Sequence, residues 1–566
     1  MNIDIIFEKI LKKKISIFCG AGISLNSGVP LVKDIKSKIL STLQLEKSDL
    51  DFLMDYRMPF ELFVECLIEN SSNSVLLDLF EIGSYNTTHL FIAQLAREGY
   101  LKNIVTTNFD NFLETALDAF KVEYKLFYKE SDFNKIDWES DGVKLIKMHG
   151  SIHDRDNMAI TIKKVSNQGS VFQRNKIIID LLKNSDSMLI LGYSCSDIFD
   201  INPTIKNCQY KESTIYYFQH DNTKQTDYSF IPIKEKIEPN PFKDFQGFSI
   251  QGDTDEFIKD LWLKIFPYKF EQTQKEVHLW GQFIDNWIKE TNRIKGEGIL
   301  CFIAGQLINA TTHYSKSLNY FFKGLDISED ASNSNLSVDF LFSIGRTYHG
   351  IQKLNESLQN SIRYLNSGLK KSRRHKLREK ECSILLSLGI VHEDKQDHYV
   401  AIKFYEDALK IAKQKRNQVL VAKCLGNLGI VFKNMAISDK NNKSNLLLRA
   451  LLFQRKSLQI SIDTGDKRSE GRTYGNIAVI LNMQAKKIKA IEYSLQALQI
   501  AVDLSDLYHQ GIWKHNIGDY YIGIDNIKAK EYLSEAKEIF ISEGLDSFLK
   551  ASNETIEKLN KIINMD

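Results

Sequence analysis

Four short segments in the first half of the chain place polar or glycine residues directly after strand-like runs of apolar residues. The first, residues 15–30, passes from a β-branched stretch into Gly20, Ala21 and Gly22, followed by Ser24. Glycine in such a turn lets backbone N–H groups approach a phosphate closely, and a following helix N-terminus adds a favourable dipole. The segment lacks the third glycine of the dinucleotide fingerprint, so a plain strand-to-helix turn explains it equally well.

The second and third segments carry an amide, a carboxylate and an imidazole. A strand-like run ends at Thr107 and Asn108, with Asp110 two positions further on, and His149 follows another such run. The carboxyl ends of parallel strands are where α/β sheets bind ligands, so these side chains suit binding or acid–base chemistry. Each also has a structural alternative, because Asn108 can cap a helix or close a turn and a lone histidine is more often structural.

The fourth segment, residues 189–197, ends a strand-like run at Gly192 and Ser194 and continues to Asp197. A turn with a capping serine is its structural alternative. Polar groups that follow four separate strands can form one site only if those strands lie side by side in a sheet.

Strand-like and helix-like segments alternate over about the first 268 residues, which predicts an α/β domain with a Rossmann-like parallel sheet and helices on both faces. A last strand and a closing helix are expected within residues 248–266, with Asp253 or Thr254 as the helix cap. The other expected strands are residues 15–19, 103–106, 144–148, 187–191 and 214–218, and the expected helices include residues 89–97, 109–120 and 171–183.

Beyond about residue 275, helical periodicity replaces the strand pattern and small residues recur every 40 to 49 positions. They are Gly305, Gly345, Gly389, Gly429, Ala478 and Gly518. A second set of small residues follows most of them at fixed offsets, as Ala401 and Ala408 follow Gly389. Such a pattern lets antiparallel helices approach closely and stack into an all-α superhelix, and it resembles the tetratricopeptide repeat. An unrelated helical domain is the alternative.

These patterns divide the chain into three parts. Residues 1–268 are expected to form the α/β domain, residues 269–297 a helical linker, and residues 298–566 the repeat domain. A chain of this length exceeds what one hydrophobic core usually serves.

In combination and in this order, the four polar segments resemble the sirtuin, or silent information regulator, family. Residues 86–89 (Asn-Thr-Thr-His) also fit, and the resemblance covers about residues 5–266. It is strongest to bacterial sirtuin-like domains of antiphage defence proteins, several of which are fused to helical sensor regions. The expected fold is therefore a sirtuin-type α/β domain followed by a tetratricopeptide-like superhelix.

The resemblance implies NAD⁺ as the substrate and assigns a role to each matched position. Asn108 would orient the nicotinamide ribose and the attacking water, and His149 would contact ribose hydroxyls and act as the general base. Asp110 would position the nicotinamide or Asn108. The remaining implied NAD⁺-binding residues are Gly20, Ala21, Gly22 and Ser24 at the pyrophosphate, Gly192, Ser194 and Asp197 at the adenosine ribose, and Thr107.

One departure from the family bears on the reaction. Protein-deacylating sirtuins carry four zinc-binding cysteines, whereas the segment after His149 contains only Cys195 and Cys208 before the helical region. We therefore expect no metal, and water as the acceptor, so that NAD⁺ and water give ADP-ribose and nicotinamide. The alternatives are a protein deacylase or ADP-ribosyltransferase recruited by the repeats, and a non-enzymatic NAD-binding scaffold.

Charge and cysteine content bear on the expected partners and on the cellular compartment. The 74 basic and 72 acidic side chains nearly balance, which gives no general reason to bind nucleic acid or a membrane surface, and the basic run at residues 369–380 suits a solvated helix face. Seven dispersed cysteines, no signal pattern and no long apolar stretch predict a cytoplasmic protein. The resemblance also implies that the repeats sense a phage protein, which triggers the enzyme. It further implies a homo-oligomer and abortive infection caused by NAD⁺ depletion.

Overall fold

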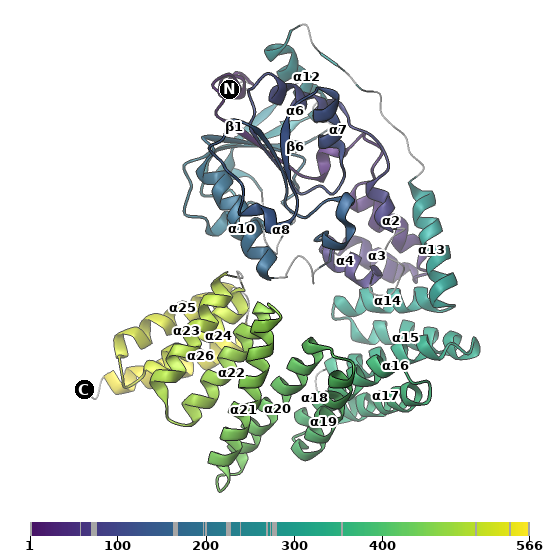
Figure 1. Ribbon diagram of the computed structural model, residues 1–566, viewed down its shortest axis with the longest axis vertical. Helices are drawn as coiled ribbons and strands as arrows, with labels where there is room; N and C mark the ends of the chain where they lie inside the picture. The colour runs from purple at the N-terminus through teal and green to yellow at the C-terminus, as the bar shows by residue number, and fades with distance from the viewer. Residues whose placement is uncertain are drawn as a thin grey trace. The chain divides into compact units, whose positions relative to one another are not determined.

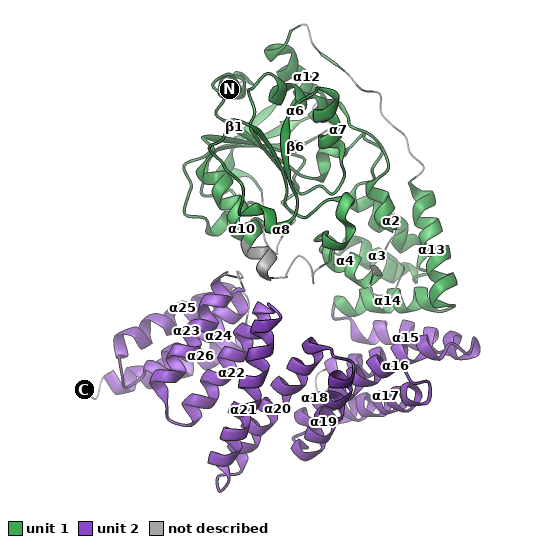
Figure 2. Cartoon of the chain, viewed as in Figure 1, with its two compact units in different colours: residues 1–311 green, residues 312–566 purple. Residues whose placement is uncertain are grey.

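The computed structural model forms two compact units, residues 1–311 and 312–566 (Figures 1 and 2). It describes residues 3–56, 58–68, 76–161, 168–195, 197, 201–221, 228–237, 239–267, 270–271, 273, 280–351, 355–503, 506–542 and 545–563. The predicted fold class is confirmed, because an α/β part with a mostly parallel sheet is followed by a long run of paired helices.

An eight-stranded sheet forms the centre of the first unit, in the order β3-β4-β2-β1-β5-β6-β8-β7. Neighbouring strands are parallel except for the last pair, in which β7 runs antiparallel to β8. The chain leaves β1 towards β2, β3 and β4 and then crosses to β5 on the other side of β1, so the direction of the strand order reverses there. The strands are β1 (Ile15–Cys19), β2 (Asn103–Thr106), β3 (Tyr124–Phe127), β4 (Val143–Lys147), β5 (Ser187–Leu191), β6 (Thr214–His220), β7 (Ser229–Pro232) and β8 (Gln246–Gly252).

Helices cover both faces of the sheet, as its fully buried central strands require (Figure 1). The helices α1 (Asp4–Leu11), α6 (Thr87–Arg97), α7 (Phe112–Ala119) and α12 (Thr254–Ile265) pack on one face, in a core with Leu145 and Leu189. The helices α10 (Gln168–Lys183) and α11 (Ile201–Asn207) cover the other face, in a core with Ile146 and Ile190. Asp253 caps α12, since its carboxylate accepts from the Glu256 amide at 3.1 Å.

The first unit contains further helices. They are α2 (Val32–Thr42), α3 (Lys47–Asp55), α4 (Phe60–Ile68), α8 (Glu130–Phe133), α13 (Gly281–Lys295) and α14 (Ile299–Ala310). Because α13 packs on α2 and α14 packs on α4, the compact unit continues to Thr311. The sequence instead groups α13 with a linker that ends at residue 297 and α14 with the repeats.

Paired antiparallel helices make up the second unit, and the small residues lie where the helices meet. A Cβ atom on Gly345 would lie 2.6 Å from Leu365, one on Gly389 2.4 Å from Tyr405, and one on Gly429 2.7 Å from Gln454. The helices are α15 (Tyr314–Asp330), α16 (Ser334–Gly350), α17 (Asn355–Arg374), α18 (Arg378–Asp394), α19 (His398–Gln414), α20 (Gln418–Ser438), α21 (Lys443–Asp463), α22 (Lys467–Met483), α23 (Lys487–Asp503), α24 (Leu507–Tyr521), α25 (Asn526–Ser542) and α26 (Asp546–Ile563).

Among the described helices, α20 alone has the length and apolar composition that a membrane crossing requires. More than half of its apolar window is buried, and it packs between α19, α21 and α22 in the core of the repeats. Its hydrophobicity is therefore explained by helix packing.

Replacing Gly389 by alanine tests the close approach of paired helices. The new methyl group would overlap the buried Tyr405 ring, so we expect the free energy of unfolding to fall by about 1–3 kcal/mol. The matched control is Gly426→Ala in α20, where a Cβ meets only Ser457 at an ordinary 3.5 Å and alanine favours the helix. Chemical denaturation of both variants measures the difference, and equal stability would contradict the packing described.

Candidate functional site

The four polar segments meet at one edge of the sheet. Gly20 follows β1, Asn108 follows β2, His149 follows β4 and Gly192 follows β5, and these strands are consecutive in the order β4-β2-β1-β5. Their carboxyl ends lie on the same edge, beside the point where the strand order reverses. This is the position at which open α/β sheets bind ligands.

Backbone packs directly against backbone where the turns after β1 and β5 meet. The Gly20 amide donates to the Leu191 carbonyl at 2.9 Å, and the Gly22 amide donates to the Gly192 carbonyl at 2.8 Å. A Cβ on Gly20 would lie 2.6 Å from the Gly192 oxygen, and one on Gly192 would lie 2.3 Å from the Ile23 nitrogen. Gly192 also has a φ of +65°, which favours glycine.

Gly20 and Gly22 therefore allow the turns after β1 and β5 to pack together, a contact that the sequence did not reveal. The amides of Gly20 and Gly22 both donate within the protein. Ala21 is the exposed residue of the turn, while Ser24 is buried. Pyrophosphate binding at Gly20, Ala21, Gly22 and Ser24 stays a prediction.

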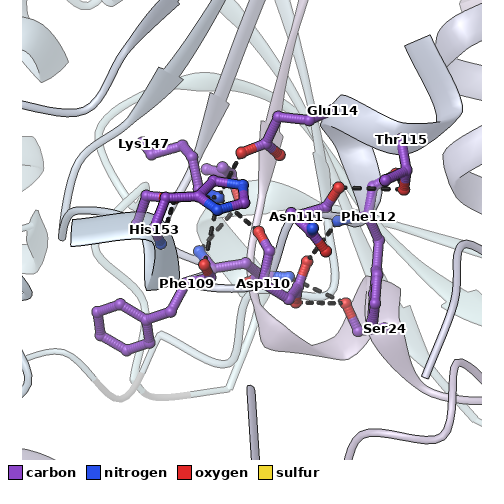
Figure 3. A network of polar contacts seen from close by, with 12 residues as sticks. Ser24, Phe109, Asp110, Asn111, Phe112, Glu114, Thr115, Lys147 and His153 are labelled. Atoms are coloured by element: carbon purple, nitrogen blue, oxygen red, sulfur yellow. Dashed lines mark hydrogen bonds and ion pairs between the residues drawn. The ribbon is translucent and has the colours of Figure 1, made fainter. Parts of the chain in front are cut away.

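Ser24, Asn108 and Asp110 form a buried chain of hydrogen bonds, of which Figure 3 shows the bond between Ser24 and Asp110. The Asn108 amide group donates to Ser24 Oγ at 3.2 Å, and Ser24 Oγ donates to Asp110 Oδ2 at 3.0 Å. The second Asp110 oxygen accepts from the Phe112 amide at 3.2 Å, which explains why α7 begins at Phe112 rather than at residue 109. Asp110 therefore orients Asn108 through Ser24.

The environment of Asp110 affects its protonation. Burial raises the pKa of this carboxyl above its usual value, and the nearby Lys147 ammonium and the bonds from Phe112 and Ser24 only partly oppose that rise. The same burial leaves Asn108 Oδ1 with no hydrogen-bond partner among the described residues. A buried amide oxygen without a protein donor is suited to accept from a ribose hydroxyl or a bound water, so this position fits NAD⁺.

His149 lies beside a carboxylate. Its Nε2 is 3.9 Å from Asp197 Oδ2, and both side chains are buried. The ring of Phe109 lies 6.4 Å from the imidazole. The resemblance predicts that Asp197 contacts the adenosine ribose, and this role stays a prediction. In the structure Asp197 lies next to His149, the expected general base.

The two remaining predicted residues contribute differently. The Thr107 amide donates to the Cys19 carbonyl at 3.0 Å, which continues the pairing of β1 with β2 past the end of the strand. Ser194 is exposed on the turn after β5. Among the described contacts, neither residue bonds to Ser24, Asn108 or Asp110.

Asn86 and His89 tie α6 to the glycine-rich turn. The Asn86 amide group donates to the Ile23 carbonyl at 2.7 Å, and its oxygen caps α6 by accepting from the Thr88 and His89 amides. The imidazole of His89 is fully buried against Asn86, and burial lowers its pKa to about 3. These residues carry the Asn-Thr-Thr-His pattern noticed in the sequence.

Sequence reasoning missed a buried ion pair beneath the site, between Lys147 of β4 and Glu114 of α7. A lysine inside an otherwise apolar strand was the available signal. Within the described part of the chain, no group of three or more histidine, cysteine, aspartate or glutamate side chains is arranged to hold a metal ion, and Cys195 and Cys208 are both buried thiols.

Comparison with known proteins finds a family match within the first unit. The family model described as SIR2-like domain matches residues 102–241, which include Asn108, His149 and Gly192. The chain therefore contains a SIR2-like domain, of the NAD-related sirtuin type. No curated protein matches the chain.

Solved structures with similar folds include helical repeat proteins. BtubC from P. vanneervenii has 17% identity and a TM-score of 0.34, covering 41% of this chain and 90% of its own. Aspartyl phosphate phosphatase F from Bacillus subtilis has 13% identity and a TM-score of 0.37, covering 54% and 81%. A putative kinesin light chain with tetratricopeptide-like repeats from Podosopora anserina has 13% identity and a TM-score of 0.30, covering 37% and 97%.

The buried His89 predicts a specific pH dependence of stability. Its pKa is about 3 in the folded protein and near 6.5 in the unfolded chain, so between these values only the unfolded chain takes up the proton. Stability must then fall as the pH falls below about 6.5, by about 2 kcal/mol between pH 7 and pH 5. Denaturation curves at both pH values should show this loss in the wild type and a smaller one in His89→Asn. Equal losses in the two proteins would contradict the assignment.

Proposed function

We propose that the first unit is an NAD⁺ glycohydrolase, which converts NAD⁺ and water to ADP-ribose and nicotinamide. The observation that carries the proposal is the buried Asn108, whose oxygen has no donor among the residues that the structure describes and whose amide group is fixed by Ser24, on the same sheet edge as His149. The SIR2-like match over residues 102–241 supports NAD⁺ as the substrate.

Asn108, His149 and Asp197 each contribute to a different part of NAD⁺ hydrolysis. The bond between the nicotinamide nitrogen and ribose C1′ breaks, and nicotinamide leaves with the electron pair while positive charge builds on the ribose. Asn108 orients the ribose and the water. His149 accepts the proton of the water as its oxygen bonds to C1′, and the Asp197 carboxylate at 3.9 Å stabilises the imidazolium that forms.

Two other functions use the same site. A deacylase would transfer the ADP-ribosyl group to the acyl oxygen of a modified protein, and an ADP-ribosyltransferase would transfer it to a protein side chain. A non-enzymatic scaffold would bind NAD⁺ without cleaving it. The small number of cysteines after His149 favours water as the acceptor, since a four-cysteine zinc module cannot be built from Cys195 and Cys208.

We further propose that the repeats regulate the enzyme by binding a protein. In four of the helix pairs, an exposed apolar residue stands two positions before the first small residue of the second helix. In three of these a basic residue follows it, as Leu448 and Arg449, Ile488 and Lys489, and Ile527 and Lys528, and the fourth is Tyr399 of α19. These apolar side chains are 58% to 82% exposed. Exposed apolar positions repeated in register mark an interaction surface.

The surface fits a polypeptide with apolar and acidic side chains, because buried apolar contacts supply affinity and the flanking cations supply charge complementarity. In the proposed role the partner is a phage protein, and its binding to a homo-oligomeric cytoplasmic enzyme starts NAD⁺ hydrolysis. Depletion of NAD⁺ then aborts the infection.

Replacing either central side chain tests the enzymatic proposal. We expect His149→Ala to lower the rate of nicotinamide release from NAD⁺ by about 100- to 10,000-fold, since it removes the general base, and Asn108→Ala to lower it similarly. The measurement is chromatography of purified full-length protein with NAD⁺ and no acceptor protein.

His153→Ala is the matched control, because His153 is exposed four residues from His149 and should retain wild-type turnover. Release of nicotinamide only after an acylated or acceptor protein is added would favour the modifying enzyme. Binding of NAD⁺ without cleavage, by activated wild type, would favour the scaffold.

The regulatory proposal is tested in cells challenged with phage. We expect Ile488→Glu combined with Ile527→Glu to abolish the fall of NAD⁺ on infection, because both changes place a charge in the docking surface. Ile237→Glu alters an equally exposed apolar residue of the first unit and should leave the response intact. An unchanged fall of NAD⁺ in the double variant would contradict this surface as the sensor.

A further inference from the structure

A buried lysine beneath the site joins the two loops that carry Asn108 and His149. Lys147 is the last residue of β4, is wholly inaccessible to solvent, and shares the sheet face of Leu145, on which α7 packs. Its ammonium lies among four acceptors (Figure 3): the carbonyls of Phe109 at 3.2 Å and Asp110 at 2.5 Å, Glu114 Oε1 at 2.7 Å and Ser151 Oγ at 3.2 Å.

These contacts come from three separate segments. Phe109 and Asp110 belong to the loop after β2, Glu114 to α7, and Ser151 to the loop after β4. The Phe109 carbonyl also accepts from the Ile152 amide at 2.9 Å, which makes a second link between the two loops. An ammonium has three protons to donate, so its hydrogen-bonding capacity is filled by protein groups. It therefore acts on the site through the loops and does not reach a substrate.

The ion pair is poorly explained by stability alone. A buried charge pair costs desolvation that its attraction seldom exceeds, and an apolar pair of similar volume is commonly as stable. Glu114 Oε2 is buried and has no hydrogen-bond partner among the described residues, so the pair is incompletely satisfied as well. What the ammonium does supply, and an apolar side chain could not, is a directional bond to two main-chain carbonyls next to Asn108.

We propose that Lys147 is a positioning residue for the reaction proposed above, on which this inference rests. Its ammonium, neutralised by Glu114, holds the loop of Asn108 against the loop of His149. The amide that orients the ribose and the base that takes the proton are then fixed relative to each other before NAD⁺ binds. Such pre-organisation is sensitive, since a misplacement of about 1 Å can cost roughly 100-fold in rate.

The test compares two lysines of one strand in full-length protein. We expect Lys147→Met to lower kcat for nicotinamide release by about 100-fold with a much smaller change in KM. Lys144→Met is the matched control: Lys144 is also buried in β4 and donates to two carbonyls, of Ser140 and Gly142, but at the far end of the strand. It should alter stability and leave kcat near the wild-type value.

A second variant separates positioning from folding. Lys147→Met combined with Glu114→Leu removes both buried charges, so we expect it to unfold at a temperature near that of the wild type while kcat stays low. Recovery of wild-type kcat together with stability would overturn the positioning role, as would an equal loss of kcat in Lys144→Met.

Amide hydrogen exchange gives a readout that does not depend on turnover. Residues 107–112 should exchange faster in both Lys147 variants and at the wild-type rate in Lys144→Met. If the wild type releases no nicotinamide, the proposed function fails while faster exchange still supports the loop contact. Unchanged protection of residues 107–112 would overturn the inference whatever the enzyme does.

Discussion

The direct contact of main chain with main chain between the turns after β1 and β5 is the constraint on which the candidate site depends. No side chain fits between Gly20, Gly22 and Gly192. Two main-chain hydrogen bonds join the two turns there, beside the central strands of the sheet. Because this contact fixes the short helix η1 (Ala21–Ser24), Ser24 lies within hydrogen-bond distance of the loop after β2. The sheet topology thus determines where the amide of Asn108 is held.

Several polar groups are buried at this edge of the sheet, and their desolvation costs free energy that an apolar core does not lose. Asn108 Oδ1 and Glu114 Oε2 lack hydrogen-bond partners among the described residues, and burial raises the pKa of Asp110. Unsatisfied buried groups in native proteins need an explanation, and a ligand site is the one that fits a sheet's carboxyl edge. The apolar cores on both faces keep the strands in place despite that cost.

Local sequence pattern predicted the central strands and the repeat register well, because fully buried strands and small residues at helix contacts leave a local signature. The edge strands β3 and β7 were not predicted, since half-exposed side chains give them no apolar run. The contacts that the glycines, Asp197 and Lys147 make could not be predicted either. Each depends on a partner 33 to 171 positions away, which only the folded sheet brings near.

The central claim is that NAD⁺ binds at the carboxyl edge of β4, β2, β1 and β5 with its nicotinamide ribose at Asn108. A crystal structure of full-length His149→Ala with NAD⁺ tests it most directly, because the variant should bind the intact substrate. The account predicts a ribose hydroxyl or water donating to Asn108 Oδ1 and the pyrophosphate beside Ala21. NAD⁺ bound elsewhere, or in the reverse direction with adenine at Asn108, would contradict it.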